Sequence, residues 1–197
     1  MSRRGKTESV ANCSGMFIKR CEIMSAVRIV KIPEGVKAHL DGSQLRITGP
    51  KGQLSRNVRF PQVIVSCTGN EVTISTESKR KEMTAMVGTL EAHTKNMCRG
   101  VSDGFEYHMK MVYSHFPIQL KLQGNRLEIA NFLGEKKARY ARIEPGVTAK
   151  IANDEVVLTG IDRELVGTSA ANIEHATHIR NRDPRVFQDG IYIVQRG

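Results

Sequence analysis

The stretch GFEYHMKMVYSHFPIQLKLQGNRLEIANFLGEKKARYAR, residues 104–142, decides the fold because it opens the second of two similar halves. Within it, IQLKLQGNRLEIANFLG from Ile118 aligns with VKAHLDGSQLRITGPKG from Val36 at one constant offset. A constant period is the sequence signature of an internal repeat. The matched positions are aliphatic residues or glycines: Val36 with Ile118, Leu40 with Leu122, Gly42 with Gly124, Leu45 with Leu127, Ile47 with Ile129 and Gly52 with Gly134.

The likeness continues toward the carboxyl end of each half. After a slip of two residues, GNEVTIS at 69–75 aligns with NDEVVLT at 153–159, and each half then enters a helical pattern with Val-Gly-Thr, at 87–89 and 166–168. The sequence therefore predicts an α+β fold of two tandem, duplicated domains, each a small, mostly antiparallel sheet packed against one α-helix.

The repeat divides the chain into three parts. Residues 1–24 are polar and lack strand or helix periodicity, which predicts a basic, flexible N-terminal arm. Residues 25–103 form the first domain and residues 104–197 the second, which ends in a basic C-terminal tail at 181–197. The pattern leaves the domain boundary open between 100 and 116. The arm is either an RNA-binding element or a dispensable extension, and its basic residues are Arg3, Arg4, Lys6, Lys19 and Arg20.

Alternating apolar residues predict the strands. AVRIVKI from Ala26 places Val27 and Ile29 on one face of a strand. Asp41-Gly42-Ser43 predicts a hairpin, because Asp-Gly readily adopts the positive φ angles of a tight turn, and Gly69-Asn70 predicts another. The second half opens with a strand that carries on one face Phe105, Tyr107, Met109, Met111 and Tyr113.

Capping residues predict where two helices begin. Ser78 is the predicted N-cap of the first helix, which ends at Gly100, and Asp162 caps the second, which ends near Asn181. Each helix also contains a glycine, Gly88 or Gly167. A glycine inside a helix costs about 1 kcal/mol relative to alanine, so both positions predict a close contact between helix and sheet.

The tail is predicted to leave the core. Pro184 prevents the second helix from continuing, and Asp189-Gly190 marks a turn. The alternating residues at 191–194 form a strand only against a surface, so we expect an RNA-facing tail that is ordered chiefly on assembly.

The charge of the chain favours a polyanionic partner. Thirty Lys and Arg against twenty Asp and Glu give a net charge of +10, and such an excess is typical of nucleic-acid binding. Residues 1–103 carry 17 basic and 9 acidic side chains, and residues 104–197 carry 13 and 11. A basic site in the second half must therefore be local.

The sequence lacks the residue patterns that metal binding, membrane insertion, secretion and catalysis require. The four cysteines show neither a CxxC pair nor zinc-ligand spacing, which argues against a metal site and a disulfide framework and favours a reducing cytoplasm. No apolar run is long enough for a membrane span. The basic start is not followed by an unbroken apolar stretch, so we expect no secretory signal. We expect no cofactor and no small-molecule substrate. An RNA-directed enzyme using His108 or His115 is the alternative, but neither histidine has an acidic partner or nucleophile at telling spacing.

Three sets of basic residues are candidates for phosphate contact. Gly49-Pro50-Lys51-Gly52 resembles the GxxG loop of KH domains, but a strand precedes it and no helix follows, so it predicts a turn that exposes Lys51. Two clusters follow turns in the second half, where Tyr140, Phe187 and Tyr192 are available for stacking. The first cluster is Lys136, Lys137, Arg139 and Arg142, and the second is Arg180, Arg182, Arg185 and Arg196.

The last stretch, HATHIRNRDPRVFQDGIYIVQRG from His175, resembles the C-terminal signature of the ribosomal large-subunit protein six family, in its archaeal and eukaryotic branch, whose eukaryotic member is called protein nine. VYSHFPI at 112–118 and NFLGEKKARYARIEPGV at 131–147 resemble the central region of that family, and the similarity spans about 26–197. The sequence departs at His175, where the family usually has glutamine.

The resemblance implies a structural protein of the cytoplasmic ribosome, with no catalysis. It implies two similar α+β domains and binding to large-subunit, 23S-type rRNA near the sarcin–ricin loop and the factor-binding region, mainly through the second domain, beside neighbouring large-subunit proteins. Besides the enzyme, a non-ribosomal RNA-binding module and a protein-interaction module that uses its sheet edges stay open as alternatives.

Overall fold

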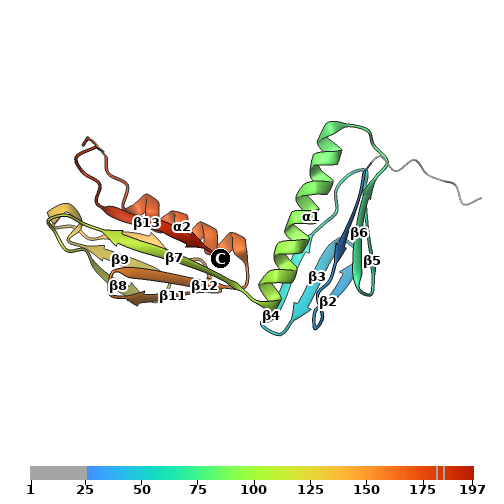
Figure 1. The fold of residues 1–197 in the computed structure, drawn as a ribbon, viewed down its shortest axis with the longest axis horizontal. Helices are drawn as coiled ribbons and strands as arrows, with labels where there is room; N and C mark the ends of the chain where they lie inside the picture. The colour runs from blue at the N-terminus through green and yellow to red at the C-terminus, as the bar shows by residue number, and fades with distance from the viewer. Residues whose placement is uncertain (1–25, 181, 184) are drawn as a thin grey trace, which may run out of the picture.

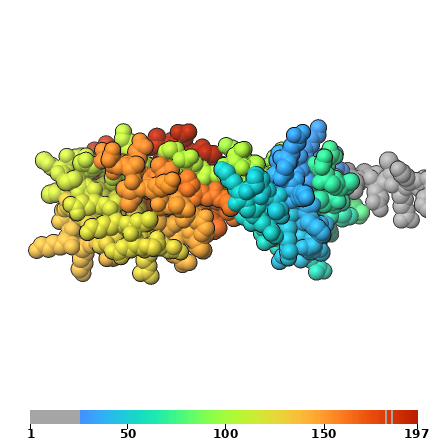
Figure 2. Space-filling model, turned by 90° about the horizontal axis from the view of Figure 1, so that it is seen from below, coloured from blue at the N-terminus to red at the C-terminus, as the bar shows by residue number. Residues whose placement is uncertain are grey.

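The structure is a computed structural model that describes residues 26–180, 182–183 and 185–197. The arm at 1–24 lies outside the described residues. Two sheet-plus-helix units lie end to end along the long axis (Figure 1), and the space-filling view shows them as two lobes (Figure 2).

The first unit contains two three-stranded antiparallel sheets and one long helix. The sheet β1-β6-β5 consists of Ala26–Lys31, Glu71–Thr76 and Val63–Thr68, and the sheet β2-β3-β4 consists of Lys37–Asp41, Gln44–Gly49 and Gly52–Asn57. Helix α1, Lys81–Ser102, packs against strands of both sheets. One core joins the three layers and includes Val30, Leu45, Ile47, Val72, Ile74 and Leu90.

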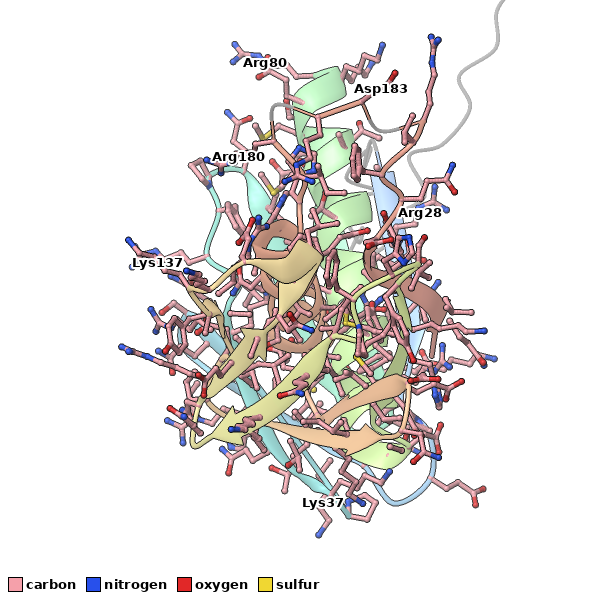
Figure 3. All side chains as sticks on the ribbon, turned by 90° about the vertical axis from the view of Figure 1, so that its left-hand side faces the viewer. Arg28, Lys37, Arg80, Lys137, Arg180 and Asp183 are labelled. Carbon is pink, nitrogen blue, oxygen red and sulfur yellow. The ribbon has the colours of Figure 1, made fainter. Side chains whose placement is uncertain are left out.

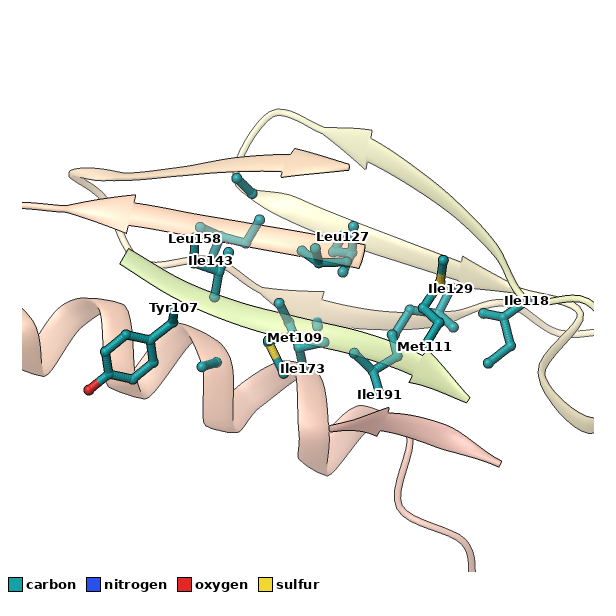
Figure 4. Close-up of a cluster of buried hydrophobic side chains, with 14 of the residues drawn as sticks. Tyr107, Met109, Met111, Ile118, Leu127, Ile129, Ile143, Leu158, Ile173 and Ile191 are labelled. Atoms are coloured by element: carbon teal, nitrogen blue, oxygen red, sulfur yellow. The ribbon is translucent and has the colours of Figure 1, made fainter. Parts of the chain in front are cut away.

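The second unit repeats this arrangement. The sheet β10-β9-β8 consists of Arg139–Arg142, Arg126–Ala130 and Gln119–Gln123. The sheet β11-β12-β7-β13 consists of Val147–Ala152, Glu155–Gly160, Phe105–Val112 and Gly190–Arg196. A short 3-10 turn, η1, covers Phe132–Gly134, and helix α2 covers Arg163–Ala176. Side chains of β7, α2 and β13 converge in the core (Figure 4), where Met109, Ile173 and Ile191 are fully buried.

The duplication predicted from the sequence is confirmed. The hairpins β2-β3 and β8-β9 turn at Gly42 and Gly124, whose φ angles are +58° and +59°. Gly69 and Asn153, aligned after the two-residue slip, both take left-handed φ angles, +54° and +49°. Equivalent aliphatic positions are buried in both units, among them Leu45 with Leu127 and Ile47 with Ile129.

The two units differ at one edge. In the second unit β7 is paired on both sides, by β12 and β13, whereas among the described strands only β6 pairs with β1. The outer face of β1 exposes Val27 and Ile29, at 42% and 54%. Val30 and Met109 hold equivalent register positions, opposite Val72 and Val156, so Val27 and Ile29 correspond to Glu106 and His108. The first unit thus presents an apolar face where its duplicate is polar.

Three expectations about the helices are wrong. Helix α1 begins at Lys81 with Arg80 as N-cap, because the Ser78 hydroxyl accepts instead from the Arg80 N–H, at 3.3 Å, before the helix. Its end lies at Ser102, since buried Val101 extends the apolar stripe past Gly100. The predicted Asp162 cap is confirmed by its bond from the Glu164 N–H, at 2.9 Å, but α2 ends at Ala176.

The predicted close contact at the helix glycines is also wrong. A Cβ at Gly88 would meet nothing within 4 Å, and one at Gly167 would only touch the Tyr107 ring at ordinary distance. Tight approaches that involve α1 lie at Gly49, against Val101, and at Gly100, against the Ile161 carbonyl. These two glycines let α1 come close to the first unit's hairpin and to the second unit.

Polar contacts and apolar residues join the two units. The Glu164 carboxylate receives Arg56 Nη1 at 2.6 Å and lies 3.0 Å from His93 Nδ1. Arg163 Nη1 donates to Asn96 Oδ1 at 3.1 Å, and Ile161 packs against the core of the first unit. Only Asp103 and Gly104 separate α1 from β7.

Candidate nucleic-acid interface

Both basic clusters of the second half, with the exception of Arg196, have residues at the end of the molecule that faces away from the first unit (Figure 3). Figure 3 looks onto this end, where the labelled Lys137 and Arg180 come from different segments. Their side chains are exposed, as are those of Lys136, Arg142, Arg182 and Arg185. The fold therefore brings together cations that are distant in sequence.

The turn after β9 positions the first cluster. Asn131, Leu133 and Gly134 all have positive φ angles, which reverse the chain around fully buried Phe132. The Asn131 side chain fixes the turn by donating to the Pro117 carbonyl at 3.1 Å. Lys136 and Lys137 follow on the exposed side of this reversal.

Arg139, a predicted phosphate ligand, is already engaged. Its guanidinium binds both carboxylate oxygens of Glu135, at 2.6 and 2.9 Å, and Nη1 donates to the carbonyls of Ala176 and His178, at 3.0 and 3.1 Å. It also lies 4.4 Å from the centroid of the Phe132 ring. The hydrogen bond from Arg139 lowers the pKa of Glu135. Arg139 thus ties the first cluster to the carboxyl end of α2, where the second cluster begins.

The second cluster stands on an anchored segment. The buried Asp189 carboxylate accepts from the Ser114 N–H at 3.1 Å, and the Ile191 N–H donates to the Thr177 hydroxyl at 3.2 Å. The expectation that the tail leaves the core is therefore wrong. The free edge of β7 supplies the surface that β13 needs, and Ile191 is fully buried there.

A hollow of about 550 Å³ lies between the two clusters. Tyr140 is its most exposed aromatic residue, at 59%. Its walls include Glu135, Arg139, Tyr140, His175, His178 and Arg180. Sequence reasoning missed His178, because nothing in the one-dimensional pattern shows that α2 ends before it and turns it toward β10.

Three of the residues that were predicted to contact phosphate have surroundings unlike those of the other candidates. Arg142 is 73% exposed and lies 3.5 Å from the Glu144 carboxylate, an exposed pair that contributes little and leaves the cation accessible. Lys51 lies at the junction of the two units, where its Nζ donates to the Asp103 carbonyl. Arg196 lies at the end of β13, opposite Tyr107, outside the cluster that holds Arg180.

The described residues contain no group of three or more His, Cys, Asp or Glu side chains that could hold a metal ion. None of the described helices is long and apolar enough to cross a membrane. His108 lies 3.6 Å from the Glu106 carboxylate on the outer face of β7, and His115 lies beside Phe116.

Comparisons with known proteins match both units. A family model described as ribosomal protein L6 matches residues 32–104 and 116–190, one segment in each unit. Large ribosomal subunit protein uL6 of Methanospirillum hungatei is 57% identical over 173 residues, which cover 88% of this chain and 98% of the relative. The protein of the same name from Methanocella arvoryzae is 51% identical over 171 residues, 86% of this chain and 97% of the relative. That from Methanobrevibacter smithii is 44% identical over 167 residues, 85% and 94%.

Proposed function

This chain belongs to the ribosomal protein L6 family, and we propose that it binds large-subunit, 23S-type rRNA through the far end of its second unit. Membership makes it a structural, non-enzymatic protein of the large ribosomal subunit. The finer proposal is contact near the sarcin–ricin loop and the factor-binding region, in cytoplasmic ribosomes, beside neighbouring large-subunit proteins.

One observation carries the proposal: two segments that hold six exposed cationic side chains meet at one hollow, lined by Arg139 and Arg180, in a nearly neutral half. Binding to phosphates releases counterions from RNA, so a gathered set of free cations gives salt-dependent affinity. Arg139 supports the site differently, because its donors already hold Glu135 and the end of α2. The proposed phosphate ligands are Lys136, Lys137, Arg142, Arg180, Arg182 and Arg185.

A charge-matched pair of variants tests this proposal. The change Lys136→Ala, Lys137→Ala, Arg142→Ala and Arg180→Ala should weaken binding to deproteinised large-subunit rRNA and lower the salt slope by roughly 0.7 to 0.9 per lost contact. The control removes exposed cations of the first unit, by Lys37→Ala, Arg59→Ala, Lys79→Ala and Lys81→Ala. Equal losses in both variants would show that net charge, and not this end of the molecule, drives binding.

A further inference from the structure

A second hollow adjoins the first, between the end of α2 and β13. Its volume is about 360 Å³, within the range of about 300 to 1,000 Å³ that is common for ligand pockets. His175 and His178 line both hollows. Four further residues that line the second hollow bear on its chemistry: Glu174, Phe187, Gln188 and Tyr192.

The backbone of this second hollow is fixed, although its rings are accessible. Thr177, which is 4% exposed, accepts from the Ile191 N–H at 3.2 Å and so joins the end of α2 to β13. The Tyr192 hydroxyl donates to the Gln188 carbonyl at 3.2 Å, which orients a ring that stays 43% exposed. The aromatic surface is therefore held in place without being covered by the described residues.

The lining suits a flat, polar-edged ring. The exposed Tyr192 ring offers a face on which a nucleobase can stack, beside Phe187, whose ring already has the Arg182 guanidinium over it. Such stacking tolerates any base because each has a π-face. The Gln188 amide and the Glu174 carboxylate offer hydrogen bonds to the edge of a base. A phosphate alone could use neither the ring faces nor the Glu174 carboxylate.

The residues around the second hollow suit the phosphate backbone of the RNA strand that would carry such a base. Arg182 stands 4.9 Å from the centroid of the Phe187 ring, and Arg180 and Arg185 are exposed on the same segment. We propose that the second hollow receives one unpaired nucleobase of the RNA, while the neighbouring arginines contact its phosphates. This inference rests on the proposed function and adds that the site distinguishes unpaired from paired RNA.

The absence of tryptophan from the chain makes the proposal directly measurable. Tyr192→Trp gives the full chain a single tryptophan at the hollow. Its fluorescence should be quenched by a single-stranded oligoadenylate and unchanged by an RNA duplex with the same number of phosphates. Ile64→Trp, at a 51% exposed position of β5, is the matched control and should respond to neither RNA.

A second variant measures the contribution of stacking. Tyr192→Leu should weaken oligoadenylate binding about 5- to 150-fold, the effect of losing one base–aromatic stack, without changing the salt slope or duplex binding. The inference would be overturned if the duplex quenched the Tyr192→Trp fluorescence as much as oligoadenylate does, or if Tyr192→Leu lost affinity equally for both RNAs. If the parent chain binds RNA with a clear salt slope but Tyr192→Trp is never quenched, the inference fails alone. Binding without any salt slope would instead overturn the proposed function.

Discussion

Arg139 is engaged by protein groups, so its guanidinium would support the proposed interface by fixing the segments that carry it. Its planar fork matches the Glu135 carboxylate and still reaches two carbonyls at the end of α2, which lysine could not do. Neighbouring Lys136 and Lys137 have no such partners among the described residues. From the sequence alone, Lys136, Lys137 and Arg139 were equal candidates for phosphate contact, because residue spacing cannot show which donors the fold already uses.

Arg139→Ala should lower the free energy of unfolding by about 1–2 kcal/mol. It removes charge-assisted hydrogen bonds, whose contribution is reduced here because the Glu135 side chain is 39% exposed to screening water. Lys136→Ala, the control, should change it by less than about 0.5 kcal/mol. Chemical denaturation of both variants measures the difference, and equal values would show that the Arg139 contacts contribute nothing.

Acid should remove the contribution of the Glu135–Arg139 pair to the free energy of unfolding. The pKa of Glu135 is lower in the folded than in the unfolded chain, so this stability is fully present above the unfolded value of about 4.3. It is lost as the pH falls through the lower, folded pKa. Subtracting the unfolding free energy of Glu135→Gln from that of the parent at each pH should give a gain that disappears on acidification. A pH-independent difference would contradict this.

Strand β13 is the element that sequence reasoning placed wrongly. The alternation at 191–194 marks a strand, but its partner β7 lies far away in the chain, and only the folded sheet shows that this edge is open to it. Local signals fared better: turn glycines, the Asp162 cap and the aligned aliphatic positions all hold in the structure. Helix ends depended on tertiary contacts such as buried Val101, which no local pattern records.

Ile191→Ala should destabilise the protein by about 2–5 kcal/mol, because it opens a cavity in a fully buried site of the core. Val194→Ala, on the same strand but 68% exposed, should change stability by less than about 0.5 kcal/mol. Urea unfolding compares the two. Deleting 190–197 should be more damaging than either, and a deleted chain with unchanged unfolding would mean that β13 is dispensable for the core.

The core contacts at the junction are not symmetric between the two units. Among the described residues, none of the first unit belongs to the core of the second, whereas Ile161 of the second packs against the core of the first. We propose a domain boundary at Asp103 and Gly104, where α1 passes directly into β7. Residues 1–24 stay outside this division, and both interpretations of the arm remain hypotheses.

The fragment 104–197 should therefore unfold cooperatively on its own, and at a higher temperature than the fragment 25–103. The fragment 104–197 keeps its complete core, whereas the fragment 25–103 loses Ile161 and the Glu164 contacts to Arg56 and His93. Calorimetry of the two fragments tests the order. If 104–197 melts without cooperativity, the boundary is misplaced.

Among the described strands, β1 has one edge without a partner, and this edge should matter before the protein reaches a ribosome. Natural sheets usually protect such edges with charge. Strand β1 carries exposed Arg28 and Lys31, but Val27 and Ile29 are exposed on it as well, at positions where β7 carries Glu106 and His108. Chains made in excess of rRNA should therefore self-associate through this strand. Sedimentation at rising concentration should show association that Ile29→Lys abolishes and that the equivalent change His108→Lys leaves intact. The supply of RNA would then set how much of this protein a cell can keep soluble.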